Sequence, residues 1–157
     1  MNLILLTVGK TDIKWVQEGL EVYASRLKHY VPFQLVEIPE LKKVKALSEE
    51  QIKEKEGELI LKYVGAQDLL VLLDEHGTQP RSLELAKWLE KQLSSGAKNL
   101  ILTVGGAYGF SREVYARAND KLSLSRLTFS HQMVRVIAAE QLYRAFTILK
   151  GEPYHHE

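Results

Sequence analysis

The chain has 157 residues, 45% hydrophobic and 26% charged, a composition that predicts one soluble domain spanning residues 1–157. It contains no cysteine, which excludes disulfides and thiolate metal sites and is typical of a cytoplasmic protein. No apolar run approaches the about 18 residues of a membrane span, and residues 1–10 lack the basic start and cleavage site of a signal peptide, so neither membrane insertion nor export is expected.

The formal net charge is only +1, so overall basicity gives no sign of nucleic-acid binding. The charge is unevenly distributed, because the formal net charge is −3 for residues 1–80 and +4 for residues 81–157. An anionic partner is therefore expected to meet the second half of the chain, although chance asymmetry explains the same numbers.

The first forty residues predict a strand, a helix and a second strand. Residues 3–8 form the continuous apolar run of a buried parallel strand. Residues 12–30 carry apolar side chains at roughly helical spacing, and Pro32 ends that helix. Residues 33–38 then read as the second strand.

A polar stretch follows, with three lysines in residues 41–46. Ser48 and Gln51 form a capping-box pattern, which predicts a helix over residues 48–64. The polar residues 41–56 can be interpreted in two ways. One is a solvated helix face, and the other is a loop whose lysines touch RNA phosphates.

The middle of the chain predicts another strand, helix and strand. Residues 69–73 form an apolar strand that ends in Asp74, Glu75 and His76. Ser82 is expected to cap a helix that stops at Gly96. Residues 100–104 form the next strand, which leads directly into a glycine-rich turn.

The last fifty residues predict two helices around an irregular passage. Ser111 is expected to start a short helix that ends at Ala118, and residues 122–129 alternate apolar and polar side chains. Residues 131–149 carry the longest helical pattern, followed by a short tail. Repeated strand–helix units with apolar strands predict an α/β fold, with a mostly parallel sheet and helices on both faces.

The turn at residues 105–109 is the strongest local signal for a ligand site. It follows a predicted central strand, at the end where open α/β sheets bind ligands, and its glycines permit close backbone approach. Its spacing fits neither a dinucleotide fingerprint nor a P-loop. Residues 122–130 could offer backbone groups to an adenine edge. Both segments can also be interpreted as ordinary connecting loops without a ligand.

Ionisable residues gather at two further places. Tyr154, His155 and His156 lie in the tail at the end of the chain. These residues could transfer a proton or stack on a base, or the tail could simply be disordered. No third ligand at metal spacing accompanies the two histidines, so no metal is expected. His76 beside Asp74 and Glu75 reads as a solvated strand end rather than as a catalytic group.

Short motifs also follow one another in a fixed order, at residues 3–10, 55–57, 72–74, 104–106, 122–129 with His131, 134–135, 140–145 and 153–155. Their order and spacing resemble, over the whole chain, the RlmH-type ribosomal RNA large-subunit methyltransferases of the SPOUT superfamily. The resemblance implies a deep C-terminal trefoil knot. Without it, an unknotted flavodoxin-like sheet would be expected, because knots are rare.

The resemblance also implies the cofactor, the substrate and the assembly. The cofactor is S-adenosylmethionine, and its implied contacts are Leu73, Gly105, Leu124, Ser125, Arg126, Leu127, Thr128 and Phe129. The implied reaction methylates N3 of a pseudouridine in 23S ribosomal RNA, on the assembled 70S ribosome, and the enzyme is a homodimer without a metal. The chain has no separate RNA-binding domain, which suits recognition by a composite surface.

The N3 atom of a pseudouridine carries a proton that must leave, so a base or a stabilised anion is required. The candidate bases are His131, Tyr154 and His155, and the last two are favoured because the family pattern ends in the same way. Arg135 and Arg144 would stabilise the anion or a phosphate, or else form ion pairs on the helix surface.

The sequence departs from the family at His156, where relatives often carry Arg or Lys, so a phosphate contact there is in doubt. Two alternatives stay open. One is a non-catalytic ribosome- or RNA-binding module that retains the fold. The other is an unknotted nucleotide-binding enzyme, which residues 8–11 disfavour because they lack the P-loop spacing.

Overall fold

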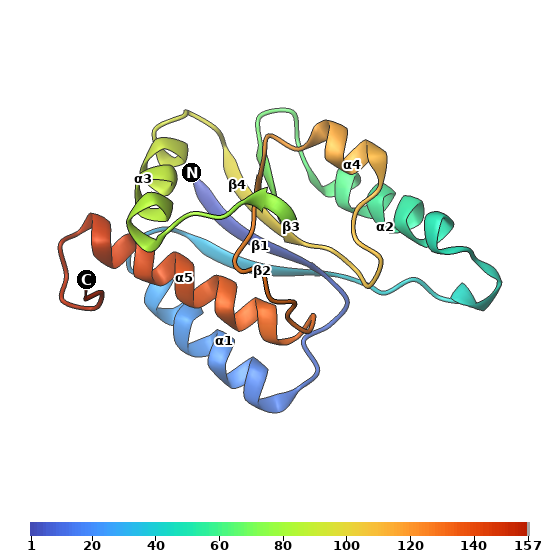
Figure 1. The fold of residues 1–157 in the computed structure, drawn as a ribbon, viewed down its shortest axis with the longest axis horizontal. Helices are drawn as coiled ribbons and strands as arrows, with labels where there is room; N and C mark the ends of the chain where they lie inside the picture. Colours follow the sequence, from blue (N-terminus) through green and yellow to red (C-terminus); the bar gives the residue numbers. More distant parts are fainter. Residues whose placement is uncertain (157) are drawn as a thin grey trace.

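The computed structural model describes residues 1–156 and arranges them as helices packed on the two faces of a sheet (Figure 1). In chain order the elements are β1 (Asn2–Val8), α1 (Lys14–Leu27), β2 (Phe33–Ile38), the 3-10 helix η1 (Val44–Ala46), α2 (Glu49–Tyr63), β3 (Leu69–Thr78), α3 (Ser82–Leu93), β4 (Asn99–Val104), α4 (Arg112–Arg117), β5 (Asp120–Leu122) and α5 (Met133–Leu149).

Within residues 1–156, five strands form one sheet in the order β2-β1-β4-β3-β5, and every pairing is parallel. The register aligns Leu5 of β1 with Leu35 on one side and with Leu102 on the other. Because strands β1 and β4 are covered on both faces, their residues are apolar almost without a break. The predicted parallel sheet is therefore confirmed.

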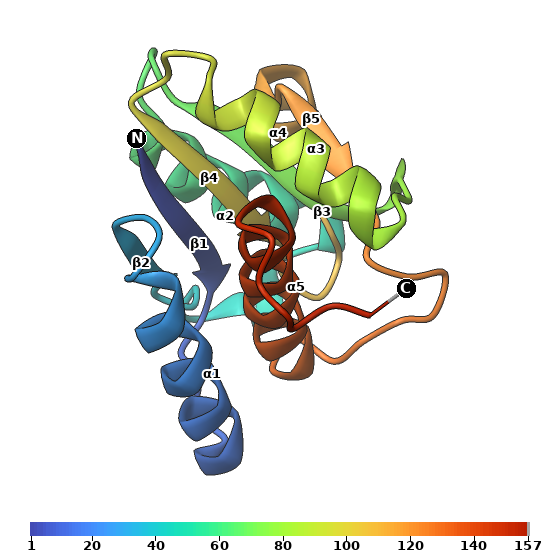
Figure 2. The ribbon, with the colours of Figure 1, turned by 90° about the vertical axis from the view of Figure 1, so that its left-hand side faces the viewer.

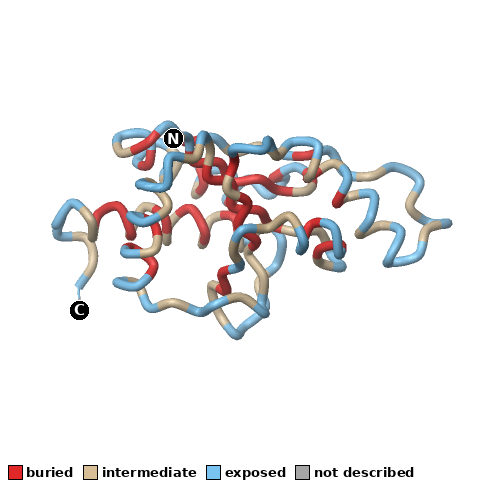
Figure 3. The backbone as a smooth tube through the Cα atoms, turned by 90° about the horizontal axis from the view of Figure 1, so that it is seen from above, coloured by how far each residue is buried: buried red, intermediate tan, exposed pale blue. Residues whose placement is uncertain are grey.

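Alternate residues of each strand feed two separate cores, because successive side chains point to opposite faces of a sheet. Leu3 and Leu5 join the core under α1, α3 and α5, whereas Ile4 and Leu6 join the core under α2 and α4. Figure 2 shows α1, α3 and α5 on one side of the sheet, with α2 behind it. The most buried backbone runs through the central strands (Figure 3).

The predicted helix starts are mostly confirmed. Ser48 accepts from Gln51 N at 3.1 Å while Gln51 Oε1 accepts from Ser48 N at 2.9 Å, which is a complete capping box. Ser111 Oγ accepts from Val114 N at 3.3 Å. The expectation for Ser82 was wrong, because that residue is already the first of α3 and the Glu84 carboxylate instead accepts from the backbone of Arg81 at 2.7 Å.

Strand β3 is longer than predicted, because it resumes pairing beyond a bulge. Leu122 of β5 pairs both with Leu73 and with Thr78, so residues 74–77 loop around the chain at that point. Ser123 N also donates to Thr78 O at 2.8 Å. A Cβ atom on Gly77 would lie 2.6 Å from the carbonyl carbon of Lys121, so only glycine allows this crossing.

The pairing shows this close crossing of β3 and β5, and the trefoil knot itself stays a prediction. After Leu122 the chain continues as an irregular segment up to α5 instead of as a strand. Among residues 1–156, no helix is both long enough and apolar enough to cross a membrane.

Candidate active site

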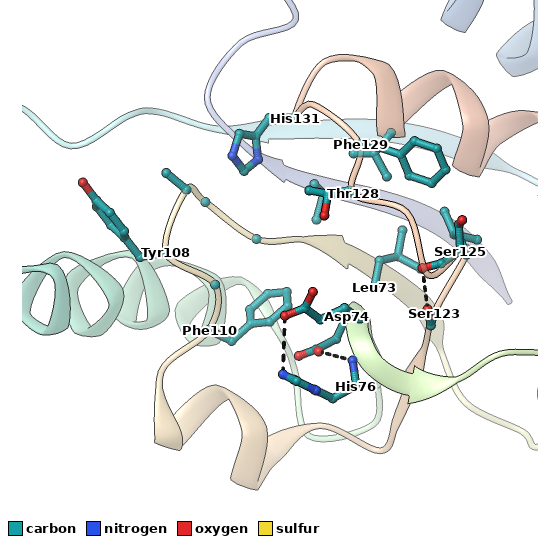
Figure 4. Close-up of a pocket in the computed structure, with 18 of the residues that line it drawn as sticks. Leu73, Asp74, His76, Tyr108, Phe110, Ser123, Ser125, Thr128, Phe129 and His131 are labelled. Carbon is teal, nitrogen blue, oxygen red and sulfur yellow. Dashed lines mark hydrogen bonds and ion pairs between the residues drawn. The ribbon is translucent and has the colours of Figure 1, made fainter.

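A cleft of about 480 Å³ opens where β3 and β4 end and the segment after β5 passes them. Its lining comes from residues 73–76, from the turn at residues 104–110, and from the segment after β5, with further side chains at Lys53, Tyr115 and Val134; the residues of that segment are 123–125, 127–129 and His131. Carboxyl ends of parallel strands are the usual ligand-binding edge of such sheets, and the volume is that of a small-molecule site. Figure 4 shows side chains from all three segments around the cleft.

The glycine-rich turn forms one wall with its backbone. Gly106 and Gly109 pair as an isolated antiparallel bridge, with Gly109 N donating to Gly106 O at 3.1 Å, and Gly109 has a φ of 86°. A Cβ on Gly105 would lie 3.1 Å from the Phe110 ring, and one on Gly106 would overlap the Glu56 carboxylate. A side chain at either position would therefore have to displace the Phe110 ring or the Glu56 carboxylate.

The opposite wall is the segment after Leu122, which is held by side-chain hydrogen bonds and not by backbone pairing in the sheet. Ser123 Oγ donates to Ser125 O at 3.0 Å, and Ser125 Oγ accepts from Leu127 N at 2.9 Å. Ser130 Oγ accepts from Met133 N at 3.1 Å, which leads the chain into α5. The side chain of Leu127 is left 76% exposed at the edge of the cleft.

One end of the cleft is charged. Asp74 accepts from the Tyr115 hydroxyl through one oxygen and from His76 N at 2.8 Å through the other. Burial, and then the hydrogen bond to Asp74 and its charge, raise the pKa of Tyr115, so that hydroxyl remains a donor. Glu75 lies beside His76, with 3.5 Å between Oε1 and Nε2.

Glu56 lies behind the glycine turn, on α2. Its Oε1 atom is buried and has no hydrogen-bond partner among the described residues. Burial, and then the charge of Glu40, raise the pKa of this carboxyl above its ordinary value. Gly57, the next residue, lets α2 approach α4, because a Cβ there would lie 2.5 Å from Ser111 Oγ.

Seven of the eight expected cofactor contacts line this one cleft: Leu73, Gly105, Leu124, Ser125, Leu127, Thr128 and Phe129. Arg126 stands among them in sequence, but it is exposed and is not part of the lining. His131, a candidate base, also lines the cleft, at the edge where α5 begins.

Arg135 lies apart from the cleft lining and is 1% exposed. Its guanidinium donates to the carbonyl oxygens of Val8 and Gly9, each at 3.0 Å. It also donates to Thr11 Oγ1 at 2.8 Å and to His131 O at 2.9 Å. Burial lowers the pKa of Arg135, while the nearby Glu37 charge opposes that shift. The side chain thus joins the end of β1 to the first turn of α5.

The tail forms a second polar cluster, around Glu140 of α5. Glu140 Oε1 accepts from Arg144 Nη2 at 2.8 Å and from the Tyr154 hydroxyl at 3.0 Å. Arg144 Nη1 lies 3.1 Å from His155 Nδ1. The structure therefore brings together the predicted Arg144, Tyr154 and His155, but none of the three lines the cleft of its own chain.

In this cluster burial and hydrogen bonds raise the pKa of Tyr154, which keeps its hydroxyl protonated. Because a guanidinium only donates, His155 Nδ1 must accept from Arg144, which leaves the ring proton on Nε2. Tyr154 also packs edge-on against Tyr143, with ring centroids 4.8 Å apart.

Several residues of the cleft were not predicted from sequence. Tyr108 lies within the glycine-rich turn and Phe110 directly follows it; both line the cleft, a role that their position could have suggested. Tyr115 and Lys53 come from α4 and α2, and no spacing in the sequence links them to the strand ends. Among residues 1–156, no three His, Asp or Glu side chains gather as a metal site would require.

A parallel sheet with a cleft between a glycine turn and a crossing segment defines the class of protein. The chain superposes on the solved structure of a probable methylase family protein from Haemophilus influenzae Rd KW20 with a TM-score of 0.50. That alignment covers 96% of this chain and 66% of the other at 16% identity, so it shows a shared fold. The family model described as Predicted SPOUT methyltransferase matches residues 1–155. The class is therefore that of the SPOUT methyltransferases.

Full-length relatives narrow this class further. The chain is 54% identical over 156 residues to the ribosomal RNA large subunit methyltransferase H of Christiangramia forsetii, with 99% of both chains covered. It is 53% identical over 157 residues to the protein of the same name from Parabacteroides distasonis, with both chains covered completely. The chain belongs to the ribosomal RNA large subunit methyltransferase H family, which confirms the resemblance inferred from its motifs.

Proposed function

We propose that this protein transfers a methyl group from S-adenosylmethionine to N3 of a pseudouridine in 23S ribosomal RNA, acting as a homodimer on the assembled 70S ribosome. The convergence of residues 73, 105, 124–125 and 127–129 on one cleft carries the proposal. The family membership supports the substrate class, since the relatives at 54% and 53% identity are named as methyltransferases of large-subunit ribosomal RNA. Its place of action would then be the cytoplasm, where ribosomes work.

The cleft fits S-adenosylmethionine in size and in chemistry. Its volume of about 480 Å³ suits a small nucleoside ligand. Leu73, Leu124 and Phe129 offer apolar surface to an adenine ring, and the backbone of residues 124–129 offers donors and acceptors to its edge. The bare backbone at Gly105 permits close approach. When bound, S-adenosylmethionine supplies a methyl group on a positively charged sulfur, a chemistry that needs no metal.

The residues of the chain would then have to position the RNA base and remove its proton. N3 must be held in line with the methyl group at near-attack distance, as apolar walls exclude water. The proton leaves N3 for a base as the new bond to carbon forms. His131 borders the cleft, and the cluster of Arg144, Tyr154 and His155 is the second source of polar groups.

Within that cluster we assign different roles to the three residues. Tyr154 keeps its proton, and it would redirect the hydrogen bond that it now donates to Glu140 toward the substrate. Arg144 would stabilise negative charge on the base, as a permanently charged donor. His155 would accept the proton once RNA binding draws its ring away from Arg144. Arg135 is better suited to positioning β1 and α5 than to touching the substrate, because it is buried and its donors are occupied.

The separation of the tail from the cleft supports a homodimer. Val134, in the lining, and Glu140, which holds Tyr154, are about 9 Å apart along the axis of α5 at 1.5 Å per residue. Figure 1 shows the tail beyond the far end of α5. A second copy would bring its own tail to the open cleft. Large apolar side chains on α1 and at the start of α5 are exposed and available for such a contact, among them Trp15 at 55% and Met133 at 41%.

Methyl transfer from labelled S-adenosylmethionine tests the proposal. The acceptors are 70S ribosomes, separated subunits and free 23S RNA, all lacking the modification. We expect incorporation at a large-subunit pseudouridine, with 70S ribosomes as the best acceptor. Binding of S-adenosylmethionine without incorporation into any acceptor would contradict the proposed substrate. Absence of binding would favour a non-catalytic RNA-binding module.

A further inference from the structure

The cleft is electrically asymmetric from end to end. Leu124, Phe129 and Val134 contribute apolar side chains to the lining, whereas Asp74 and Glu75 contribute two carboxylates. Figure 4 shows Asp74 and His76 grouped at the end of β3, away from Phe129. The proposed function requires the apolar end for an adenine and leaves the acidic end without a role.

Asp74 is held in a fixed orientation by two donors from different elements. The Tyr115 hydroxyl of α4 donates to one carboxylate oxygen, and His76 N donates to the other at 2.8 Å. Both donors are neutral, so they orient the carboxylate and leave its negative charge in place. Among the described residues, no Lys, Arg or His side chain lies within ion-pair distance of Asp74.

The cations nearby are already engaged elsewhere. Lys53 lines the cleft, but its Nζ atom lies 2.9 Å from Glu50 Oε2 on the same helix. Lys121 lies over the Tyr115 ring, 5.6 Å from its centroid. Glu75 lies 3.5 Å from His76, and the side chains of Glu75 and His76 are about three-quarters exposed, at 73% and 75%. The acidic end therefore presents negative charge that a positively charged ligand would balance.

We propose that Asp74, assisted by Glu75, forms a cation subsite that makes the cleft prefer the methyl donor over its demethylated product. This inference rests on the proposed function. S-adenosylmethionine carries a positive charge on sulfur that S-adenosylhomocysteine lacks, so a carboxylate in the same cleft attracts the first more strongly. The same difference weakens the hold on the product after transfer, and that favours its release.

Calorimetric titration of the whole chain with three ligands tests this subsite. The ligands are S-adenosylmethionine, S-adenosylhomocysteine and sinefungin, whose amine places a positive charge near the position of the sulfonium. We expect Asp74→Asn to weaken both cationic ligands about three- to tenfold and to change S-adenosylhomocysteine less than about twofold. Added salt should reduce the preference of the wild type in the same direction.

Three control variants separate charge from structure. Tyr115→Phe removes the hydroxyl that orients Asp74 but keeps the charge, so it should retain most of the preference for cationic ligands. Glu75→Gln, at an exposed side chain without the Tyr115 contact, should lower that preference by about twofold, and it serves as the second test if Asp74→Asn does not fold. Glu90→Gln removes an exposed carboxylate from α3, outside the cleft, and should leave all three affinities unchanged.

The outcomes distinguish this inference from the proposed function. A selective loss of cationic ligands in Asp74→Asn and, more weakly, in Glu75→Gln supports the subsite. If the variants weaken all three ligands equally or none at all, the subsite is overturned while donor binding stands. If the wild type binds none of the three, the proposed function falls, and the subsite falls with it.

Discussion

Arg135 carries a charge that almost no solvent reaches, and its energetic role follows from that isolation. Its donors satisfy the carbonyl oxygens of Val8, Gly9 and His131, which would otherwise have to find other partners at the end of β1. A buried cation with this many partners is costly to transfer from water, but it is still more costly to disrupt. Arg135 therefore fixes the position of the first turn of α5 relative to the end of β1.

Replacement of this side chain should destabilise the fold. We expect Arg135→Met to lower the free energy of unfolding by about 3 kcal/mol, because one buried and two partly buried carbonyl oxygens lose their donor. Urea denaturation measures the loss, and Arg126→Met, at an exposed position, is the matched control with a change near zero. A loss below about 1 kcal/mol would contradict the structural role.

Glu56 makes a pH-dependent contribution of known sign. Its pKa is raised by burial above the ordinary value of 4.5, so the folded chain holds this proton more tightly than the unfolded chain does. The stability that this proton provides is present below about pH 4.5 and is lost as the pH rises through the higher folded value. At neutral pH the ionised carboxylate is left with a buried oxygen that lacks a partner.

Glu56→Gln should remove this pH dependence. At pH 7 we expect the variant to be more stable than the wild type by about 1 kcal/mol, the order of an unsatisfied buried group. At pH 4 the two should differ little, because both side chains are then neutral. Denaturant titration at the two pH values measures the difference. If the variant differs from the wild type by the same free energy at pH 4 and pH 7, or is less stable at pH 7, burial of the Glu56 carboxylate does not cause the pH dependence.

Among single residues, the sequence indicates some positions in the cleft and gives no sign of others. The family motifs predicted that Leu73 and residues 124–129 contact the cofactor, and the structure places all of them except Arg126 in the lining of the cleft. Asp74 was interpreted as a solvated strand end, because its orienting partner Tyr115 is 41 residues away in the chain. Contacts of that kind depend on how α4 packs beside β3, which no local pattern encodes.

Among the elements, the crossing of β3 by the segment at Leu122 imposes the strictest local demand. Gly77 meets the backbone of residues 121 and 122, with the Lys121 carbonyl carbon and Leu122 N at 2.6 and 2.7 Å from the place of a Cβ. Backbone atoms cannot move to another rotamer, so a methyl group would have to push β5 away from β3. The bulge and the passage beneath it are therefore built around this glycine.

Gly77→Ala should separate the two segments and lower the free energy of unfolding by about 3 kcal/mol. Gly19→Ala is the matched control in α1, because its Cβ would meet only Val136 methyl groups at 3.4 Å. That control should gain about 1 kcal/mol, since alanine favours a helix over glycine. Thermal or urea unfolding measures both variants. A neutral Gly77→Ala would mean that the crossing is looser than the geometry requires.

The elements themselves were largely predictable from periodicity. Residues 33–38 match β2 residue for residue, and the apolar run before the glycine turn matches β4 to within one residue. The continuation of β3 to Thr78 was missed, because residues 74–77 are polar or glycine and resemble a loop. The segment after Leu122 was also beyond prediction, because serine hydrogen bonds, and not a strand ladder, fix its path.

For the whole molecule, the strand order β2-β1-β4-β3-β5 did not follow from local patterns. Apolar runs identify strands that are buried on both faces, but they do not say which strands are neighbours. The expectation of a threaded chain came from the resemblance alone, because elementary rules argue against knots. The separation of the tail from its own cleft likewise appears only in three dimensions.

That separation yields a prediction about the assembly. We expect a cleft variant, Gly105→Val, and a tail variant, Tyr154→Phe with His155→Ala, each to lose most methyl transfer. Co-expression of the two should restore roughly a quarter of the wild-type rate, because half of the dimers are then mixed and each mixed dimer has one intact composite site. No restoration, despite mixed dimers shown by mass spectrometry, would contradict completion of the cleft by a second copy.

Binding of the methyl donor in the cleft can be tested by NMR. The ¹⁵N-labelled chain is titrated with S-adenosylmethionine, and the changes in its amide chemical shifts are assigned to residues. We expect the largest shifts at Leu73, at Gly105 and in residues 124–129, with little change in α1 or in the tail. Saturable shifts centred elsewhere, or none at concentrations far above those at which methyltransferases work, would contradict binding in the cleft.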